Sequence, residues 1–164
     1  LPRPQIFNIA TATTMNFKDL QNYLYDHIPL TQTMQVEITE ISKTSLTLTA
    51  PLEPNINHQE TAFGGSASAL CILSAWSFIH CRLKDYPQFT PGIVIQRNTM
   101  EYTRPVPDRF QARCTLDSET RWDRLIQSLE RKGIGRIQLT STLLCHGEES
   151  GYFEGSFVIS VRPL

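Results

Sequence analysis

The sequence lacks the cysteine spacing of a zinc site or a disulfide framework. It has four cysteines in 164 residues, and no two of them form a CxxC pair. Three of them lie in strongly apolar stretches, where a reduced thiol behaves as a small hydrophobic side chain. Reduced core thiols are typical of cytosolic proteins. We therefore expect no metal, no disulfide framework and a cytoplasmic location. The cysteines are Cys71, Cys81, Cys114 and Cys145.

The sequence also lacks an excess of charge of one sign and a long hydrophobic run. Its 15 Lys and Arg residues nearly balance its 16 Asp and Glu residues, for a formal net charge of −1. Such a chain has little non-specific attraction to nucleic acid or to an anionic membrane. No uninterrupted run approaches the ~18 apolar residues of a membrane span. No basic segment followed by an apolar block follows Leu1, so no signal peptide is predicted.

What is present is one domain of ordinary size with two kinds of periodicity. Residues 1–15 have no clear period, and we interpret them as an irregular lead-in to a single domain over 16–164. Helical spacing predicts a short helix capped by Asn16 and ended by Pro29, and a second one ended by Gly133. Alternating spacing predicts six strands, with a turn at 42–44 in the first hairpin and a loop at 147–151 in the last. The strands are expected near 34–38, 46–50, 93–102, 110–116, 136–145 and 152–161.

The chain is organised around a polar loop that leads into an apolar helix. Residues 66–84 carry no charged face before Arg82, which predicts a helix wrapped by the rest of the protein. Gly64 and Gly65 allow a close backbone approach, and Ser66 is the expected N-cap. The unpaired N–H groups of the first helical turn then face the loop.

Strands grouped around one crossing helix predict an α+β fold with a largely antiparallel sheet. A curved antiparallel sheet wrapped around one long buried helix is the hot-dog fold. The loop motif, with 102–106 and 122–124 downstream, resembles the thioesterase domain that some bacteria carry fused to an acetyltransferase. The loop motif is Pro54-Asn55-Ile56-Asn57-His58 followed by Thr61-Ala62-Phe63-Gly64-Gly65-Ser66. The resemblance covers about residues 17–162, and this sequence contains no acetyltransferase domain.

The resemblance implies hydrolysis of an acyl thioester, carried by coenzyme A or by an acyl-carrier protein. The amides of Gly65 and Ser66 would polarise the thioester carbonyl, and Asn57 would position the attacking water. His58 or Glu60 would take its proton. Each of these residues also has a structural alternative. The glycine pair could serve helix packing, and Asn57 could cap the loop. His58 could be an ordinary loop histidine, and Glu60 a solvated carboxylate.

Further substrate contacts are expected from the loop and from two distant residues. Thr61, Phe63 and Gly64 belong to the loop, and Asn98 on a strand is a candidate to complete the site of a partner subunit. Arg124 belongs to a basic cluster that could hold the phosphates of coenzyme A, or could be a solvated face. No cofactor is expected beyond the coenzyme A of the substrate. The resemblance implies a homodimer or a dimer of dimers, joined through residues 93–102.

One departure concerns the helix carboxylate. Hot-dog thioesterases similar to the phenylacetyl-CoA group carry a carboxylate about seven residues after the second glycine. Ile72 occupies that position here, and no Asp or Glu occurs from Ser66 to Arg82. This absence favours the alternative function, a non-catalytic module that binds or senses acyl thioesters. A hydratase or dehydratase on the same fold ranks last, since it needs the missing acid.

Overall fold

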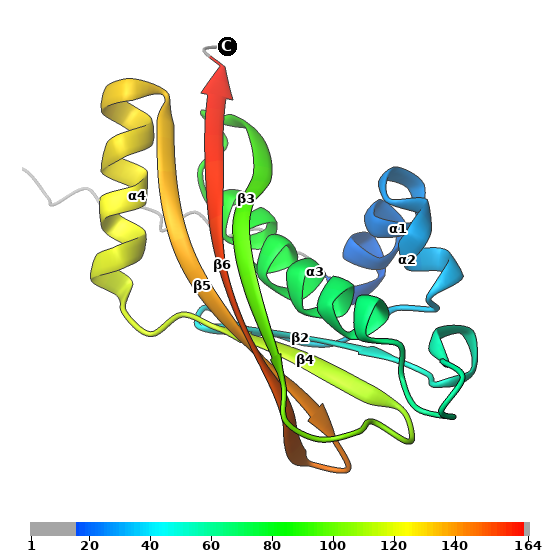
Figure 1. The fold of residues 1–164 in the computed structure, drawn as a ribbon. Helices are drawn as coiled ribbons and strands as arrows, with labels where there is room; N and C mark the ends of the chain where they lie inside the picture. The colour runs from blue at the N-terminus through cyan, green and yellow to red at the C-terminus, as the bar shows by residue number, and fades with distance from the viewer. Residues whose placement is uncertain (1–15, 163–164) are drawn as a thin grey trace, which may run out of the picture.

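A computed structural model describes residues 16–162 (Figure 1). The predicted lead-in over 1–15 lies outside the described residues. The elements in chain order are α1 (Phe17–His27), α2 (Pro29–Thr33), β1 (Glu37–Ile41), β2 (Ser45–Ala50), the 3-10 turn η1 (Glu53–Asn55), α3 (Gly64–Leu83), β3 (Thr90–Tyr102), β4 (Phe110–Thr115), α4 (Glu119–Lys132), β5 (Ile134–Cys145) and β6 (Glu148–Arg162).

The six strands form one antiparallel sheet in the order β1-β2-β4-β5-β6-β3. This confirms the predicted α+β class and the predicted number of strands. In Figure 1 the long strands β5, β6 and β3 bend away from β2 and β4, so that the sheet curves around α3. β3 is at the edge, paired to β6 on one side only. Its 13 residues are mostly exposed.

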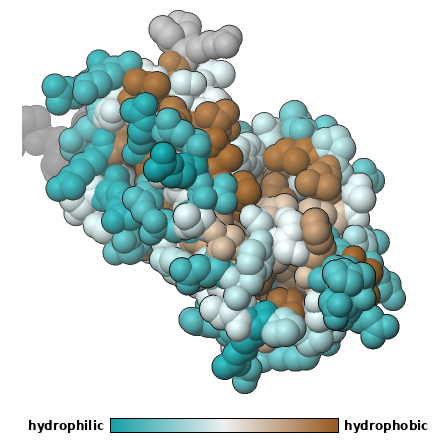
Figure 2. All heavy atoms as spheres, in the orientation of Figure 1, coloured by the Kyte–Doolittle hydropathy of each residue, from teal (hydrophilic) through white to brown (hydrophobic). Residues whose placement is uncertain are grey.

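The buried helix α3 packs against strands from both halves of the sheet. By length and composition it could cross a membrane. However, 61% of its apolar 18-residue window is buried inside the fold, as expected for a core helix. Ala69, Ile72 and Trp76 form a half-exposed stripe at helical spacing along it. Figure 2 shows hydrophobic residues gathered in the middle of this face, between the α4 side and the α1–α2 side.

Two helix boundaries follow the sequence prediction closely. Asn16 caps α1, because its side-chain oxygen accepts a hydrogen bond from Asp19 N at 2.8 Å. Gly133 ends α4 in the left-handed conformation, with φ of 68°. Pro29, by contrast, does not only end α1: it is the first residue of α2, where its missing N–H costs nothing.

Three other boundary predictions are wrong. The first strand, predicted near 34–38, is Glu37–Ile41, because Met34 is the C-cap of α2 and Gln35 is left-handed, with φ of 55°. Ser66 is not the N-cap of α3, because the helix begins two residues earlier and Phe63 is the N-cap. Gly64 and Gly65 adopt the helical conformation and form the first turn of α3. The loop predicted at 147–151 is also too long. His146 and Gly147, with φ of 52° and 75°, make a two-residue turn that starts β6 at Glu148.

Candidate active site

A pocket of about 590 Å³ opens where the loop before α3 meets the end of β3. Gln59 and Thr61 of the loop line one side, and Gly64 and Ala67 of α3 line another. Tyr102 at the end of β3 and the following segment 103–106 complete the wall. Two parts of the chain that are distant in sequence, 59–67 and 102–106, therefore meet at the N-terminus of the buried helix.

The loop keeps its shape through the side chain of Asn57. Asn57 Oδ1 accepts hydrogen bonds from Gln59 N at 2.8 Å, from Thr61 N at 3.3 Å and from Thr61 Oγ1 at 3.3 Å. Such a side-chain turn allows Glu60 to adopt its left-handed φ of 59°. Asn57 Nδ2 is also engaged, with Ala62 O at 3.4 Å. The carboxamide is therefore occupied within the loop.

A second asparagine anchors the loop to the body of the protein. Asn55 is buried, and its Nδ2 donates to Met34 O at 3.0 Å and to Pro51 O at 2.8 Å. Its backbone oxygen accepts from Phe63 N at 2.7 Å, directly before α3. Asn55 thus fixes the point at which the helix starts. The family motif contained this residue, but sequence reasoning gave it no role.

The two glycines at the start of α3 lie in different environments. The Tyr102 hydroxyl donates to Gly64 O at 2.7 Å, which ties the end of β3 to the helix. A Cβ added at Gly65 would lie 2.3 Å from Cε1 of Phe63, so the absent side chain makes room for that ring. The first helical hydrogen bond runs from Ala67 N to Phe63 O at 3.0 Å. The amides of Gly64, Gly65 and Ser66 precede it.

This chain matches over residues 17–161 the family model YiiD_C, whose description is "Putative thioesterase (yiiD_Cterm)". The chain belongs to the YiiD_C family. Among solved structures it is similar to a protein of unknown function from Chlorobaculum tepidum, with 30% identity and a TM-score of 0.82 over 88% of this chain and 94% of that one.

Two further structures support the fold of this YiiD_C member. One is described as a putative thioesterase from Shewanella oneidensis, with 24% identity and a TM-score of 0.78, covering 89% of this chain and 97% of that one. The other is a thioesterase from Haemophilus influenzae, with 12% identity and a TM-score of 0.72, covering 92% and 94%. At these identities the likeness shows the fold alone. The predicted hot-dog fold is confirmed.

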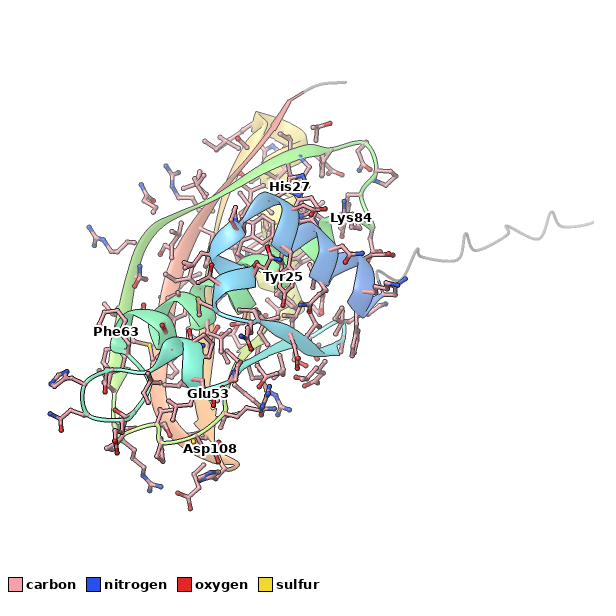
Figure 3. The ribbon with its side chains drawn as sticks, turned by 90° about the vertical axis from the view of Figure 1, so that its right-hand side faces the viewer. Tyr25, His27, Glu53, Phe63, Lys84 and Asp108 are labelled. Carbon is pink, nitrogen blue, oxygen red and sulfur yellow. The ribbon has the colours of Figure 1, made fainter. Side chains whose placement is uncertain are left out.

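The pocket beside the start of α3, here called the loop pocket, contains some of the predicted site residues and has others nearby. Thr61 and Gly64 line it. Asn57, Gly65 and Ser66 belong to the same loop and helix turn without lining the pocket, and Figure 3 shows Phe63 beside the edge strand. His58 and Glu60 are exposed on the loop. The loop therefore brings most of the predicted residues into one region.

The two distant candidates are not part of this pocket within one protomer. Asn98 lies in the middle of β3, opposite Gly155 of β6, and is exposed. Arg124 is on α4, where it lines a hollow of about 150 Å³ with Arg131 and Lys132. α4 packs on β5 and β6, away from the loop. Any role of Asn98 or Arg124 at the loop would need a second protomer or an extended substrate.

Sequence reasoning missed most of the residues that line the loop pocket, among them Gln59, Tyr102 and Arg104. A signal for the last two existed, because both belong to the 102–106 segment that carried the family resemblance. Arg104 supplies positive charge at the pocket and forms an ion pair with exposed Glu148. Both partners are solvated, so this pair adds little stability.

The ionisable groups near the helix limit the possible chemistry. None of the residues that line the described pocket is a carboxylate or a histidine. Cys71, one helical turn beyond Ala67, is buried, and burial raises the pKa of its thiol to about 12. It is therefore no nucleophile. Within residues 16–162, no cluster of three or more His, Cys, Asp or Glu side chains is placed to hold a metal ion.

Proposed function

We propose that this YiiD_C member hydrolyses an acyl thioester of coenzyme A or of an acyl-carrier protein at the pocket beside the α3 N-terminus. The observation that carries the proposal is the meeting of the ordered Asn57 loop, the first turn of α3 and Tyr102 around one pocket of about 590 Å³. Pockets of this size hold small-molecule ligands or parts of larger ones.

The first step is addition of water to the thioester carbonyl. Negative charge develops on the carbonyl oxygen, and the amides of Gly65 and Ser66, with the helix dipole behind them, would stabilise it. The carbon–sulfur bond then breaks, and the thiolate leaves with the proton that the water has lost. The products are a carboxylic acid and a free thiol.

In this proposal, residues of the loop position the attacking water and take its proton. Asn57 holds the loop in place rather than offering a free amide, so we propose that it acts by positioning the main chain and Thr61. His58 and Glu60 are the nearest titratable side chains on the loop and both are exposed. Either side chain would contact a substrate only if the thioester itself binds over the loop, or if a second protomer packs over the loop and encloses it.

A homodimer would provide that cover. The free edge of β3 offers unpaired backbone groups to a second copy of itself, and Val94 on it is 61% exposed. Antiparallel pairing about a two-fold axis near the middle of β3 would set the Tyr102 end of one strand beside the Thr90 end of the other. Asn98, near that axis, would then lie between the two protomers.

The second candidate function is a non-catalytic module that binds acyl thioesters. It is favoured by the pocket lining, in which the described residues include no carboxylate, and by Ile72 at the position of the expected helix carboxylate. Such a module would use the same amides and the same apolar helix face without a base. Turnover separates the two candidates.

The test is hydrolysis of a panel of acyl-CoAs from acetyl to palmitoyl, measured by the release of the free thiol. We expect turnover in the wild type, a loss of roughly 10²-fold in Asn57→Ala through a displaced loop, and a loss of ~10²–10⁴-fold in whichever of His58→Ala and Glu60→Gln removes the base. Asn22→Ala, exposed on α1, is the matched control. Saturable binding without turnover at any chain length would leave only the binding module.

A further inference from the structure

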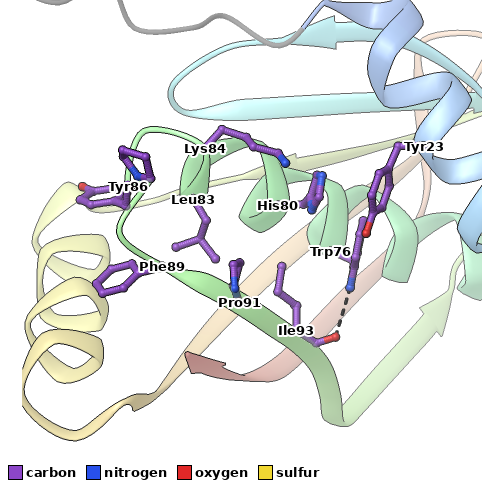
Figure 4. Close-up of a pocket in the computed structure, with 10 residues that line it drawn as sticks. Tyr23, Trp76, His80, Leu83, Lys84, Tyr86, Phe89, Pro91 and Ile93 are labelled. Carbon is purple, nitrogen blue, oxygen red and sulfur yellow. Dashed lines mark hydrogen bonds between the residues drawn. The ribbon is translucent and has the colours of Figure 1, made fainter. Parts of the chain in front are cut away.

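A second pocket, of about 400 Å³, lies at the opposite end of α3 (Figure 4). It is lined mainly by rings and aliphatic groups from α1, α3, the connection after α3 and the start of β3, among them Tyr23, Trp76, Phe89 and Ile93. Trp76 is 12 residues beyond Gly64, which is roughly 18 Å along a helix. The pocket is therefore separate from the loop site within one protomer.

The aromatic wall is held rigidly. The rings of Tyr23 and Trp76 stack with centroids 6.1 Å apart, and the His80 ring lies 4.5 Å from Tyr23 and 4.9 Å from Trp76. Trp76 Nε1 donates to Ile93 O at 3.2 Å, which joins the helix to the edge strand. A wall of this kind binds hydrocarbon without first having to become ordered.

Besides the two tyrosines, two polar side chains, His80 and Lys84, belong to this lining. His80 is 92% buried, since its exposed fraction is 8%, and its Nε2 has no hydrogen-bond partner among the described residues. Burial, with smaller effects of Lys84 and His27, lowers the pKa of His80 to about 4, so the ring is neutral near pH 7. A buried polar atom without a protein partner is one that a ligand atom can satisfy.

Lys84 supplies a positive charge at the same place. Its side chain extends toward His80 in Figure 4, and no described carboxylate forms an ion pair with it. In Figure 3 it lies at the other end of α3 from Phe63, near His27 of α1. An unpaired ammonium beside an apolar pocket favours an anionic ligand with a hydrocarbon body.

We propose that this pocket, formed by Tyr23, Trp76, His80, Lys84, Phe89 and Ile93, binds a small hydrophobic carboxylate. The carboxylate lies against the Lys84 ammonium, and the hydrocarbon part packs on Trp76 and Ile93. The tautomer of His80 that carries a proton on Nε2 supplies a second donor for the carboxylate. This site is distinct from the loop pocket of the same protomer, and it binds its ligand whether or not the loop pocket hydrolyses thioesters.

The test is titration of the full chain with octanoate and with phenylacetate, read by tryptophan fluorescence and by calorimetry. Trp76 lies in the pocket and the other tryptophan, Trp122, is fully buried elsewhere. We expect saturable binding of at least one acid, with a fluorescence change that disappears in Trp76→Phe. The two acids distinguish an alkyl from an aryl ligand.

The charge is tested by Lys84→Gln, with Lys132→Gln on α4 as the matched control. Loss of one charge-assisted hydrogen bond should weaken carboxylate binding roughly tenfold in Lys84→Gln. The control should bind as the wild type does, and the uncharged alcohols octanol and 2-phenylethanol should not respond to the Lys84 substitution. Absence of saturable binding, or equal affinities of the wild type and Lys84→Gln for the acids, would overturn the proposal.

Discussion

At the scale of single residues, Asn57 shows how a polar side chain can serve a site without facing it. Its oxygen accepts three hydrogen bonds from the loop, and its nitrogen is engaged with Ala62 O. The loop histidine and glutamate near it are exposed. The residue that shapes the loop and the residue that takes the proton are therefore different ones in our proposal.

His80 provides a prediction of pH-dependent stability. Its pKa is lowered by burial from 6.5 to about 4 in the folded protein, so between these values the unfolded chain binds a proton that the folded chain does not. The stabilising effect of the neutral ring is complete above pH 6.5 and is lost as the pH falls toward 4. The loss approaches ~3 kcal/mol in the free energy of unfolding.

Urea unfolding from pH 7.5 to 4 measures this effect. His80→Phe should lose less stability than the wild type over that range, because phenylalanine has no proton to bind. His58→Gln, altered on the exposed loop, is the control and should follow the wild-type curve. If the wild type and His80→Phe lost stability equally, the His80 ring would have to be accessible to water in the folded protein.

At the scale of elements, α3 joins the two pockets. Its half-exposed stripe of Ala69, Ile72 and Trp76 carries no charge and leads from the loop pocket toward the aromatic pocket. In the proposed function each buried methylene of an acyl chain would contribute ~0.8 kcal/mol, so an apolar helix face of this length would favour longer acyl groups. Ile72, at the place of the expected helix carboxylate, lies midway along it.

Filling this stripe should shorten the preferred acyl group. We expect Ile72→Trp to lower kcat/KM for palmitoyl-CoA by roughly tenfold, the equivalent of one or two lost methylene contacts. Activity toward acetyl-CoA should change by less than about twofold, since a short chain does not reach Ile72. The measurement is kcat/KM across the acyl-CoA panel.

Gln127→Trp, on the exposed surface of α4, controls for the added ring. An equal fall in kcat/KM for short and long chains in Ile72→Trp would mean that the stripe does not receive the acyl group.

At the scale of the whole molecule, α3 covers one face of the sheet, but the outer edge of β3 has no strand paired to it. Free edges of this length invite pairing with another strand, and natural proteins block them with lysine, proline or bulges when pairing is harmful. β3 contains Pro91 near its start and one irregularity, between Ile95 and Arg97, but it has no lysine and keeps an exposed Val94. The stretch from Asn98 to Tyr102 has none of these blocking features, which supports the proposed pairing through β3.

The prediction is a homodimer in solution that Val94→Lys converts to a monomer. A lysine at this position would put a charge from each protomer into the interface, and both charges would need to be desolvated. Light scattering after size-exclusion chromatography measures the mass. Tyr152→Lys, an exposed position on β6 (44%), is the control and should remain dimeric. A wild-type monomer at micromolar concentration would exclude pairing through β3.

The local pattern of the sequence was sufficient for the fold class and for most elements, although it did not predict α2. Alternation and helical spacing predicted the six strands, and an apolar helix without a charged face had to be enclosed by them. Asn16 and Gly133 marked helix ends through their own backbone chemistry. The boundaries that failed, at residues 34–38, at Ser66 and at residues 147–151, depended on turn geometry that several residue types can adopt.

The sites were decided by tertiary structure, because their parts are distant along the chain. Nothing in the local pattern indicates that the Tyr102 hydroxyl meets Gly64 O, or that Asn55 fixes the start of α3. The aromatic pocket has the same cause: Tyr23, Trp76 and Ile93 come from three elements that pack together only when the sheet curves around the helix. The sequence by itself therefore determined which elements form and which loop carries polar groups, since these depend on neighbouring residues. Which side chains meet, and where cavities remain, was determined only by long-range packing.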